Sequence, residues 1–247
     1  MAGVSRQTGG VSTTNTTGES LSIDVPAVAV RPSIRPRSAP ANEYDVAYVE
    51  ALGDPAALPW WEGGPCPALV TWLNAVAPQV IRPGARTAVT CCGLGDDAAL
   101  LVDRGYDVSA FDVAPAAIAW ARARHPRAAN CFHVCDLRET PVGWHGRFDF
   151  VVDVNAVCHA QDRAAHLVGA RTLMTTRAVL LVICHGHGKG QLGAPRALAS
   201  TELSEAAHAA GLEVVGEIGD FEDEGAAGGP RHRLRGLLRK ADAPRGA

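Results

Sequence analysis

The sequence has almost no lysine, since Lys189 and Lys240 are the only two among its 247 residues. Arginine therefore carries nearly all of the positive charge, and a formal net charge of −3 leaves no basic excess that would attract nucleic acid. No segment approaches the ~18 consecutive apolar residues of a membrane span, and the N-terminus lacks the apolar core of a signal peptide. We expect a protein that binds neither nucleic acid nor membrane.

The cysteines also exclude a class of protein. There are seven, an odd number, and no secretory signal accompanies them. Such cysteines are expected to be reduced thiols in a cytoplasm. Cys131, His133 and Cys135 alternate along one expected strand, but ligands on one continuous strand lie about 6–7 Å apart, too wide for one zinc ion. We therefore expect a cytoplasmic protein without a metal, in which these three residues pack in the core.

The chain is expected to consist of a flexible tail at 1–40 and one domain at 41–241. The tail is rich in Gly, Ser, Thr, Pro and Arg and has no sustained period. In the domain, short apolar runs that predict strands alternate with helical periods. Strands are expected at 87–92, 106–111, 130–135, 148–152, 178–184, 212–218 and 233–239, and helices at 44–52, 67–76, 98–104, 114–124, 163–174 and 201–210.

This alternation predicts an α/β fold: a doubly wound, Rossmann-like, mostly parallel sheet of seven strands with helices on both faces and an antiparallel last strand. Residues 231–239 are basic and alternate with leucine, so we expect a half-exposed edge strand there.

The most informative stretch is Thr87–Ala121, which reads as strand, glycine turn, helix, strand, acidic residue and helix. Gly93 and Gly95 remove side chains where a ligand can approach the backbone closely. Asp96 is expected to cap the following helix, whose free N–H groups suit an anionic group. Asp112 ends the next strand, where a carboxylate can accept hydrogen bonds from both hydroxyls of a ribose. The stretch therefore predicts a nucleoside-containing cofactor.

Together with further motifs, this stretch resembles the class I S-adenosylmethionine-dependent methyltransferases, and among them the thiopurine methyltransferase-like group, which includes thiol and halide methyltransferases. The motifs that carry the resemblance are TrpXXGlyXProXPro at Trp60–Pro67, CysGlyLeuGlyAspAsp at Cys92–Asp97, AlaPheAspVal at Ala110–Val113, Asp136-Leu137, and PheAspPheValValAsp at Phe148–Asp153. The resemblance covers about residues 45–240. It departs from the family at Cys91, where the family has a glycine, and in the loop at 154–161.

The resemblance implies roles in holding S-adenosylmethionine. The residues concerned are Cys92, Gly93 and Gly95 beneath the methionine part, Asp112 on the ribose, Val113 and Leu137 beside the adenine, Asp136 on the adenine amino group, Trp60 closing over the cofactor, and Asp153 facing the site of methyl transfer.

The acceptor is expected to be a small molecule. The resemblance favours a thiol sulfur, with an oxygen or nitrogen of a specialised metabolite as the alternative. A hydroxyl acceptor needs a general base, and His159 is our candidate, with Asn155 and Asp153 as orienting residues. His185 and His187 follow the next strand and are further candidates.

Two other functions stay open. Gly93, Gly95 and Ala98 fit a GlyXGlyXXAla pattern, and Asp112 would serve NAD equally well, as in a nicotinamide-dependent oxidoreductase. The substitution at Cys91 is compatible with a non-catalytic cofactor-binding protein that has a degenerate glycine turn.

Overall fold

The computed structural model describes residues 43–58, 60–187, 196–224 and 230–242. The chain divides into two units, Met1–Pro40 and Ala41–Ala247, and the fold below is that of the second. The tail expected at 1–40 lies outside the described residues.

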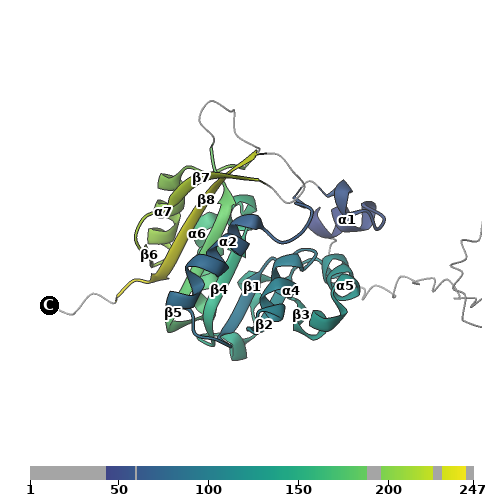
Figure 1. The fold of residues 1–247 in the computed structure, drawn as a ribbon, viewed down its shortest axis with the longest axis horizontal. Helices are drawn as coiled ribbons and strands as arrows, with labels where there is room; N and C mark the ends of the chain where they lie inside the picture. The colour runs from purple at the N-terminus through teal and green to yellow at the C-terminus, as the bar shows by residue number, and fades with distance from the viewer. Residues whose placement is uncertain (1–42, 59, 188–195, 225–229, 243–247) are drawn as a thin grey trace, which may run out of the picture. The chain divides into compact units, whose positions relative to one another are not determined.

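One mixed β-sheet forms the centre of this unit (Figure 1). Its strands are β1 (Arg86–Thr90), β2 (Asp107–Asp112), β3 (Phe132–Val134), β4 (Phe148–Val154), β5 (Met174–His185), β6 (Leu212–Val214), β7 (Gly219–Glu224) and β8 (Pro230–Lys240). The order is β3-β2-β1-β4-β5-β8-β6, with β7 also paired to β8. The first five strands are mutually parallel, whereas β8 runs antiparallel to β5, β6 and β7.

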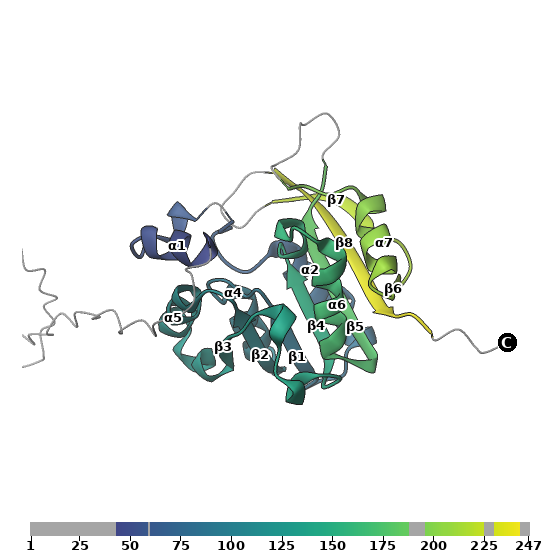
Figure 2. The same cartoon turned by 180° about the vertical axis from the view of Figure 1, so that it is seen from behind.

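Helices cover both faces of the sheet (Figures 1 and 2). They are α1 (Glu43–Glu50), α2 (Pro67–Ala75), α3 (Ala77–Val80), α4 (Asp96–Asp103), α5 (Pro115–Arg124), α6 (Arg163–Leu173) and α7 (Ser200–Ala209). Side chains of α2–α5 share one buried cluster with strand residues such as Val89 and Phe150. Side chains of α6 and α7 share a second cluster with Val151 and Leu180, on the opposite face. Neighbouring strand residues thus alternate between two cores.

Local signals explain several helix ends. Pro67 and Pro115 are the first residues of α2 and α5, where the N–H that proline lacks would have no helical partner. The Asp162 side chain accepts a hydrogen bond from the N–H of Ala165, 2.9 Å away, and so caps α6. Gly211, at φ +70°, follows the end of α7 in the left-handed region that favours glycine.

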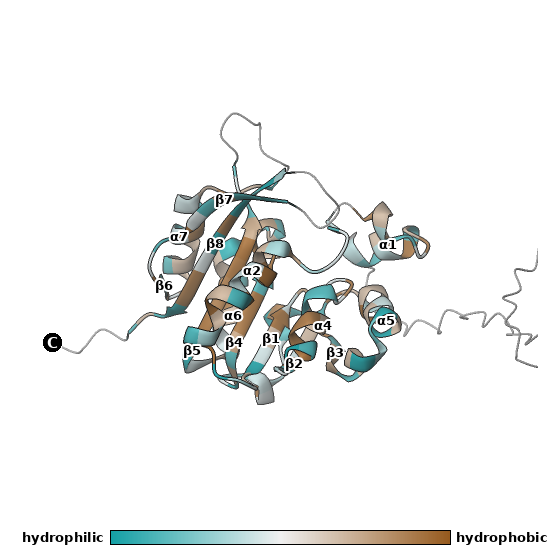
Figure 3. Cartoon of the chain, in the orientation of Figure 1, coloured by the Kyte–Doolittle hydropathy of each residue, from teal (hydrophilic) through white to brown (hydrophobic). Residues whose placement is uncertain are grey.

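The fold class confirms the sequence prediction, and two details differ from it. The described sheet has eight strands, because the segment expected as one strand at 212–218 is followed by a separate strand, β7. The sequence of β7, GlyAspPheGluAspGlu, is hydrophilic, as its colouring in Figure 3 shows, so an apolar pattern could not reveal it. The edge strand expected at 231–239 is wrong: β8 pairs on both sides, and Arg233 is fully buried.

The parallel order places a topological switch between β1 and β4, since the chain leaves β1 toward β2 on one side and returns to β4 on the other. Ligands of open α/β sheets bind in the crevice that such a switch opens at the carboxyl ends of the strands. A third apolar cluster, which includes Tyr48 of α1, Leu94 and Ala114, packs beside this crevice.

Candidate active site

A cavity of about 600 Å³ opens at the carboxyl ends of β1, β2 and β4. Most residues predicted to serve a cofactor or acceptor line it: Trp60, Cys92, Gly93, Gly95, Asp112, Val113, Asp136, Leu137, Asn155 and His159. Asp153 is fully buried and does not line the cavity. The lining also includes Glu62, Asp97 and His166, to which the sequence motifs assign no role.

The turn after β1 adopts the left-handed backbone conformation three times. Cys91, Gly93 and Gly95 have φ of +47°, +52° and +83°. A Cβ on Gly95 would lie 2.6 Å from the Phe132 ring, so this glycine also permits close packing of the turn against β3. The cap expected at Asp96 falls one residue earlier: Gly95 is the N-cap, and Asp96 is the first residue of α4.

Asp112 ends β2 and reaches back to this turn. Its two oxygens accept hydrogen bonds from the backbone N–H groups of Gly93, at 3.0 Å, and Ala114, at 2.9 Å. Burial raises the pKa of Asp112, and these two N–H groups partly offset that effect. The carboxylate is thus fixed at the cavity wall and keeps further lone pairs for a ligand's hydroxyl groups.

Asp136 follows β3 and is held by its own neighbour. Its carboxylate accepts from the backbone N–H of Arg138 at 2.9 Å and pairs with the Arg138 guanidinium at 2.6 Å. That hydrogen bond lowers the pKa of Asp136 and keeps it ionised. Leu137, next in the chain, is buried against Gly169 of α6.

A group of aromatic side chains lines the cavity beside the glycine turn, where the Tyr48 hydroxyl would lie 3.1 Å from a Cβ on Gly93. The Trp60 indole N–H donates to the Tyr48 hydroxyl at 3.0 Å, and the Trp60 ring meets the rings of Tyr44, Tyr48 and His159 edge to face. Edge-to-face contacts are the favoured geometry of aromatic pairs. The predicted position of Trp60 at the cavity therefore comes with partners on α1 that sequence patterns do not reveal.

Asp153 lies behind the cavity wall and forms a hydrogen bond with His166, which lines the cavity. Its carboxylate accepts from the Thr90 hydroxyl at 2.8 Å, from the Val157 N–H at 3.0 Å and from His166 Nε2 at 2.6 Å. Burial opposes ionisation, but the contacts with His166 and Thr90 outweigh it and lower the pKa of Asp153. Burial would depress the pKa of His166, and Asp153 instead raises it.

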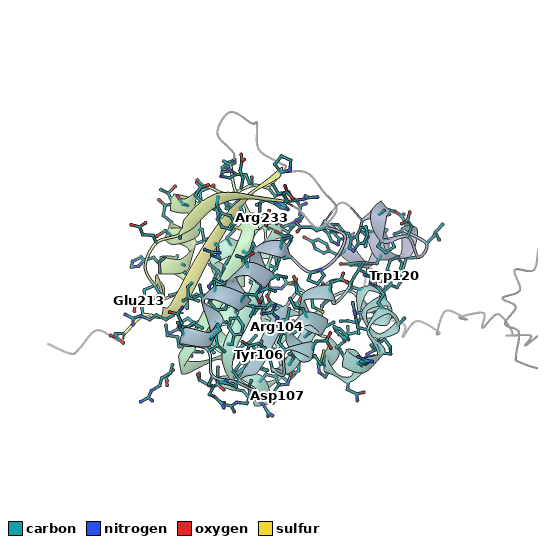
Figure 4. The ribbon with its side chains drawn as sticks, in the orientation of Figure 1. Arg104, Tyr106, Asp107, Trp120, Glu213 and Arg233 are labelled. Atoms are coloured by element: carbon teal, nitrogen blue, oxygen red, sulfur yellow. The ribbon has the colours of Figure 1, made fainter. Side chains whose placement is uncertain are left out.

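Asn155 belongs to a second buried network. At φ +58° it donates to Glu62 at 3.0 Å and accepts from Arg233 at 3.2 Å. Arg233, labelled on β8 in Figure 4, also pairs with Glu62 and, at 3.2 Å, with Asp223 of β7. Burial opposes the charge on Glu62, but Arg233 lowers the pKa of Glu62 so that it stays ionised. This network fixes the loop that carries Trp60 to the sheet.

The three candidate histidines occupy different surroundings. His159 lines the cavity, and its Nδ1 lies 3.0 Å from Nη1 of Arg196. A guanidinium only donates, so Nδ1 of His159 must accept, and in the neutral ring the proton sits on Nε2. Burial and Arg196 lower the pKa of His159. His185 lies 3.7 Å from Glu62 and His187 is half exposed beside Glu202; neither lines the cavity.

Acidic side chains dominate the charge of the cavity. Besides Asp112 and Asp136, the lining includes Asp97, which accepts from the Cys66 N–H at 2.7 Å. Burial raises the pKa of Asp97 to about 7, despite that hydrogen bond, and nearby Glu62 adds to the rise. A ligand with positive charge would be stabilised here.

No cluster of three or more metal-ligating side chains occurs among the residues that the structure describes. No described helix has the length and apolar composition needed to cross a bilayer. All seven cysteines are free thiols.

Comparison with known proteins adds to this geometry. Residues 89–175 match the family described as "Methyltransferase domain". This range runs from β1 to the start of β5 and therefore contains the glycine turn, Asp112, Asp136 and the loop after β4. A search of curated proteins finds no match.

Solved structures share the fold. A protein described under the conversion of a disulfide bond into a thioacetal group during echinomycin biosynthesis has 22% identity and a TM-score of 0.64, over 80% of this chain and 91% of that one. A 1,6-didemethyltoxoflavin-N1-methyltransferase of Burkholderia thailandensis, with bound S-adenosylhomocysteine, has 20% identity and a TM-score of 0.60, over 85% and 94%. The [4+2]-cyclase SpnF has 15% identity and a TM-score of 0.62, over 82% and 96%.

By this match residues 89–175 are a methyltransferase domain, and the described unit shares its fold with solved methyltransferases such as the one with bound S-adenosylhomocysteine.

Proposed function

We propose that residues 41–241 form a catalytic domain that transfers a methyl group from S-adenosylmethionine to a small-molecule acceptor bound in the cavity. The observation that carries the proposal is the pair Asp112 and Asp136, which line one cavity at the ends of adjacent strands within the matched methyltransferase domain. Free thiols throughout support a reducing compartment, and we propose the cytoplasm.

The residues present suit the cofactor's chemistry. When bound, S-adenosylmethionine supplies an electrophilic methyl carbon on a positively charged sulfur. Asp112 is placed to accept from ribose hydroxyls and Asp136 to accept from the adenine amino group, while Leu137 and Val113 offer apolar contact beside it. The left-handed turn at Gly93 brings backbone rather than side chain to the cavity. The acidic lining matches the cofactor's positive charge.

The protein's main task is then to place the acceptor atom in line with the methyl carbon. Proximity and orientation can supply up to about 7–11 kcal/mol of the barrier. Trp60, fixed by Tyr48 and by the network around Glu62, closes over the cofactor and also borders the space for the acceptor, since its ring contacts His159.

The family resemblance and the cavity geometry favour different acceptor atoms. Resemblance to the thiopurine methyltransferase-like group favours thiol sulfur, and a thiolate needs no base. The buried Asp153–His166 pair instead favours an acceptor that must lose a proton. The fold alone does not decide the reaction, as its likeness to a cyclase illustrates.

Calorimetry with S-adenosylmethionine, S-adenosylhomocysteine and NAD tests the proposal. We expect heat from the first two and none from NAD. A screen of thiols, phenols and amines, scored by release of S-adenosylhomocysteine, then identifies the acceptor. Absence of binding by both sulfur compounds would overturn the assignment and leave a non-catalytic protein with a degenerate turn at Cys91.

A further inference from the structure

His166 and Asp153 form a buried histidine–carboxylate pair that the family match does not assign. Asp153 belongs to β4, Thr90 is its register partner at the end of β1, and His166 lies in the second turn of α6. Thr90 and Asp153 lie side by side because their adjacent parallel strands end at the same edge of the sheet. Helix α6 packs near that edge and brings His166 into contact with Asp153. The His166 side chain is 11% exposed and lines the cavity, whereas Asp153 is 0% exposed.

The hydrogen bonds define the state of the pair. Asp153 accepts three hydrogen bonds, from a hydroxyl, a backbone N–H and His166. An acceptor of three hydrogen bonds is stabilised as the carboxylate, so Asp153 is not the group that takes a proton from a ligand. Its engagement of Nε2 leaves Nδ1 as the His166 nitrogen that can exchange a proton with a ligand in the cavity.

The thiols near the pair and the second lining histidine do not supply a competing base. The thiols of Cys158 and Cys184 are buried near Asp153, and burial raises the pKa of each. Desolvation and the nearby carboxylates of Asp112 and Asp153 raise the pKa of Cys91 as well, so all three thiols are neutral near pH 7. His159 is the other lining histidine, and its Nδ1 lone pair is used by Arg196. His159 therefore offers an N–H to the acceptor rather than a base.

We propose that His166, oriented by Asp153, is the general base of the reaction, and that the acceptor is a hydroxylated aromatic molecule whose O–H proton passes to His166 Nδ1. The proposal rests on the methyltransferase function above. The acceptor oxygen forms a bond to the methyl carbon as the carbon–sulfur bond of the sulfonium breaks and leaves its electron pair on sulfur. The proton on His166 is then released to solvent. The aromatic wall of Trp60, Tyr44 and His159 suits a flat ring.

The test variant is His166→Gln. Glutamine can still donate a hydrogen bond to Asp153, so it preserves the structural contact, but it cannot take up a proton. His208→Gln on the exposed side of α7 is the matched control. Thermal unfolding and S-adenosylhomocysteine affinity are measured for each protein first, and both are expected to match those of the unsubstituted protein.

The first readout needs no turnover. 4-Nitrophenol is titrated into the S-adenosylhomocysteine complex, and the visible absorption of its phenolate is followed against pH. We expect ionisation of the bound phenol at a lower pH than free in solution, and a shift of about one pH unit toward the free value in His166→Gln. Failure of the phenol to bind, or an identical titration in both proteins, would overturn the assignment.

The second readout compares acceptors of different acidity. Loss of a general base typically costs about 10²–10⁴-fold, so His166→Gln should lose that much with a weakly acidic phenol and far less with thiophenol. Equal losses with both acceptors would rule out proton transfer. A loss of S-adenosylhomocysteine affinity would place the pair in cofactor binding and equally overturn the proposal. If the unsubstituted protein does not bind S-adenosylhomocysteine, the proposed function itself fails.

Discussion

The two sides of the cavity are held together in different ways. On the cofactor side, at the ends of β1–β3, the functional carboxylates accept hydrogen bonds from backbone N–H groups at short sequence separation. The donor to Asp136 is two positions away, and the donors to Asp112 are two and nineteen positions away. On the acceptor side, around β4, β8 and the Trp60 loop, the bonds join distant segments; Glu62 and Arg233 are 171 positions apart. We therefore expect substitutions on the cofactor side to change affinity and those on the acceptor side to change stability.

The largest effect is expected from Arg233→Met. This variant leaves Glu62 and Asp223 buried without their partner, and breaking a buried ion pair costs about 3–5 kcal/mol. The free energy of unfolding, measured with denaturant, should fall by that amount. Arg239→Met on the same strand removes a half-exposed ion pair with Glu213 and should cost less than about 1 kcal/mol.

A double variant sharpens this result. Adding Glu62→Gln to Arg233→Met removes one of the two unpaired charges and should recover part of the loss. If the double variant loses as much unfolding free energy as the two single variants together, the pair does not couple the Trp60 loop to the sheet.

The next largest effect is expected from Asp112→Asn. The amide nitrogen would face the Gly93 or Ala114 N–H, and the charged acceptor for ribose hydroxyls is lost. Hydrogen bonds to charged groups contribute about 1.5–3 kcal/mol, so S-adenosylmethionine affinity should fall about 10- to 100-fold in calorimetry. Asp107→Asn, at the exposed start of the same strand, is the control. If both variants bind alike, Asp112 serves only the turn.

The same contrast explains how much the sequence could predict. Glycine turns and an acid at the end of a strand are short-range patterns, and Gly93, Asp112 and Asp136 all line the cavity as expected. The strands that carry them are apolar runs in a parallel order, and the fold class followed from these runs. Helix and strand ends moved by a few residues, because the flanking residues fit either state.

The acceptor side carried weaker signals. The sequence predicts an edge strand around Arg233, because the hydrophilic β7, which pairs with this strand, has no apolar pattern. Glu62 is one acid in a proline- and glycine-rich loop, and its partners lie more than ninety positions away. His166 did have a signal: it follows the expected loop after β4 and borders the buried face of α6, which includes Leu167.

Asp97 links the two sides, since it is the second residue of α4 and its side chain accepts a hydrogen bond from the Cys66 N–H of the Trp60 loop. Its pKa is raised from 3.8 to about 7. The folded state therefore binds more protons than the unfolded state between these values, and this group reduces stability as pH rises through that window. A cationic ligand favours the ionised carboxylate, so S-adenosylmethionine affinity should rise with pH.

Calorimetry between about pH 6 and pH 8 should show a rise of up to about tenfold, the equivalent of one pKa unit. Asp97→Asn keeps an acceptor for Cys66 and should flatten this dependence. Asp103→Asn, exposed at the other end of α4, should retain it. An unchanged slope in Asp97→Asn would assign the dependence to another group, such as Asp112.

The smallest effect, and the sharpest comparison, is expected from Cys91→Gly. Cys91 has φ +47°, a conformation that destabilises the folded state by about 1–2 kcal/mol when the residue has a side chain. Glycine removes that cost but makes folding less favourable by about 0.5–1 kcal/mol, because it has more conformational entropy in the unfolded state. The variant should gain about 0.5–1 kcal/mol of stability and, because the Cβ leaves the cavity, bind S-adenosylmethionine a few-fold more tightly. Leu52→Gly, at φ +51° after α1 and 91% exposed, should gain similar stability with no change in affinity. If Cys91→Gly gained stability but lost affinity, the thiol itself would contact the cofactor, and the departure from the family's glycine would be a functional replacement.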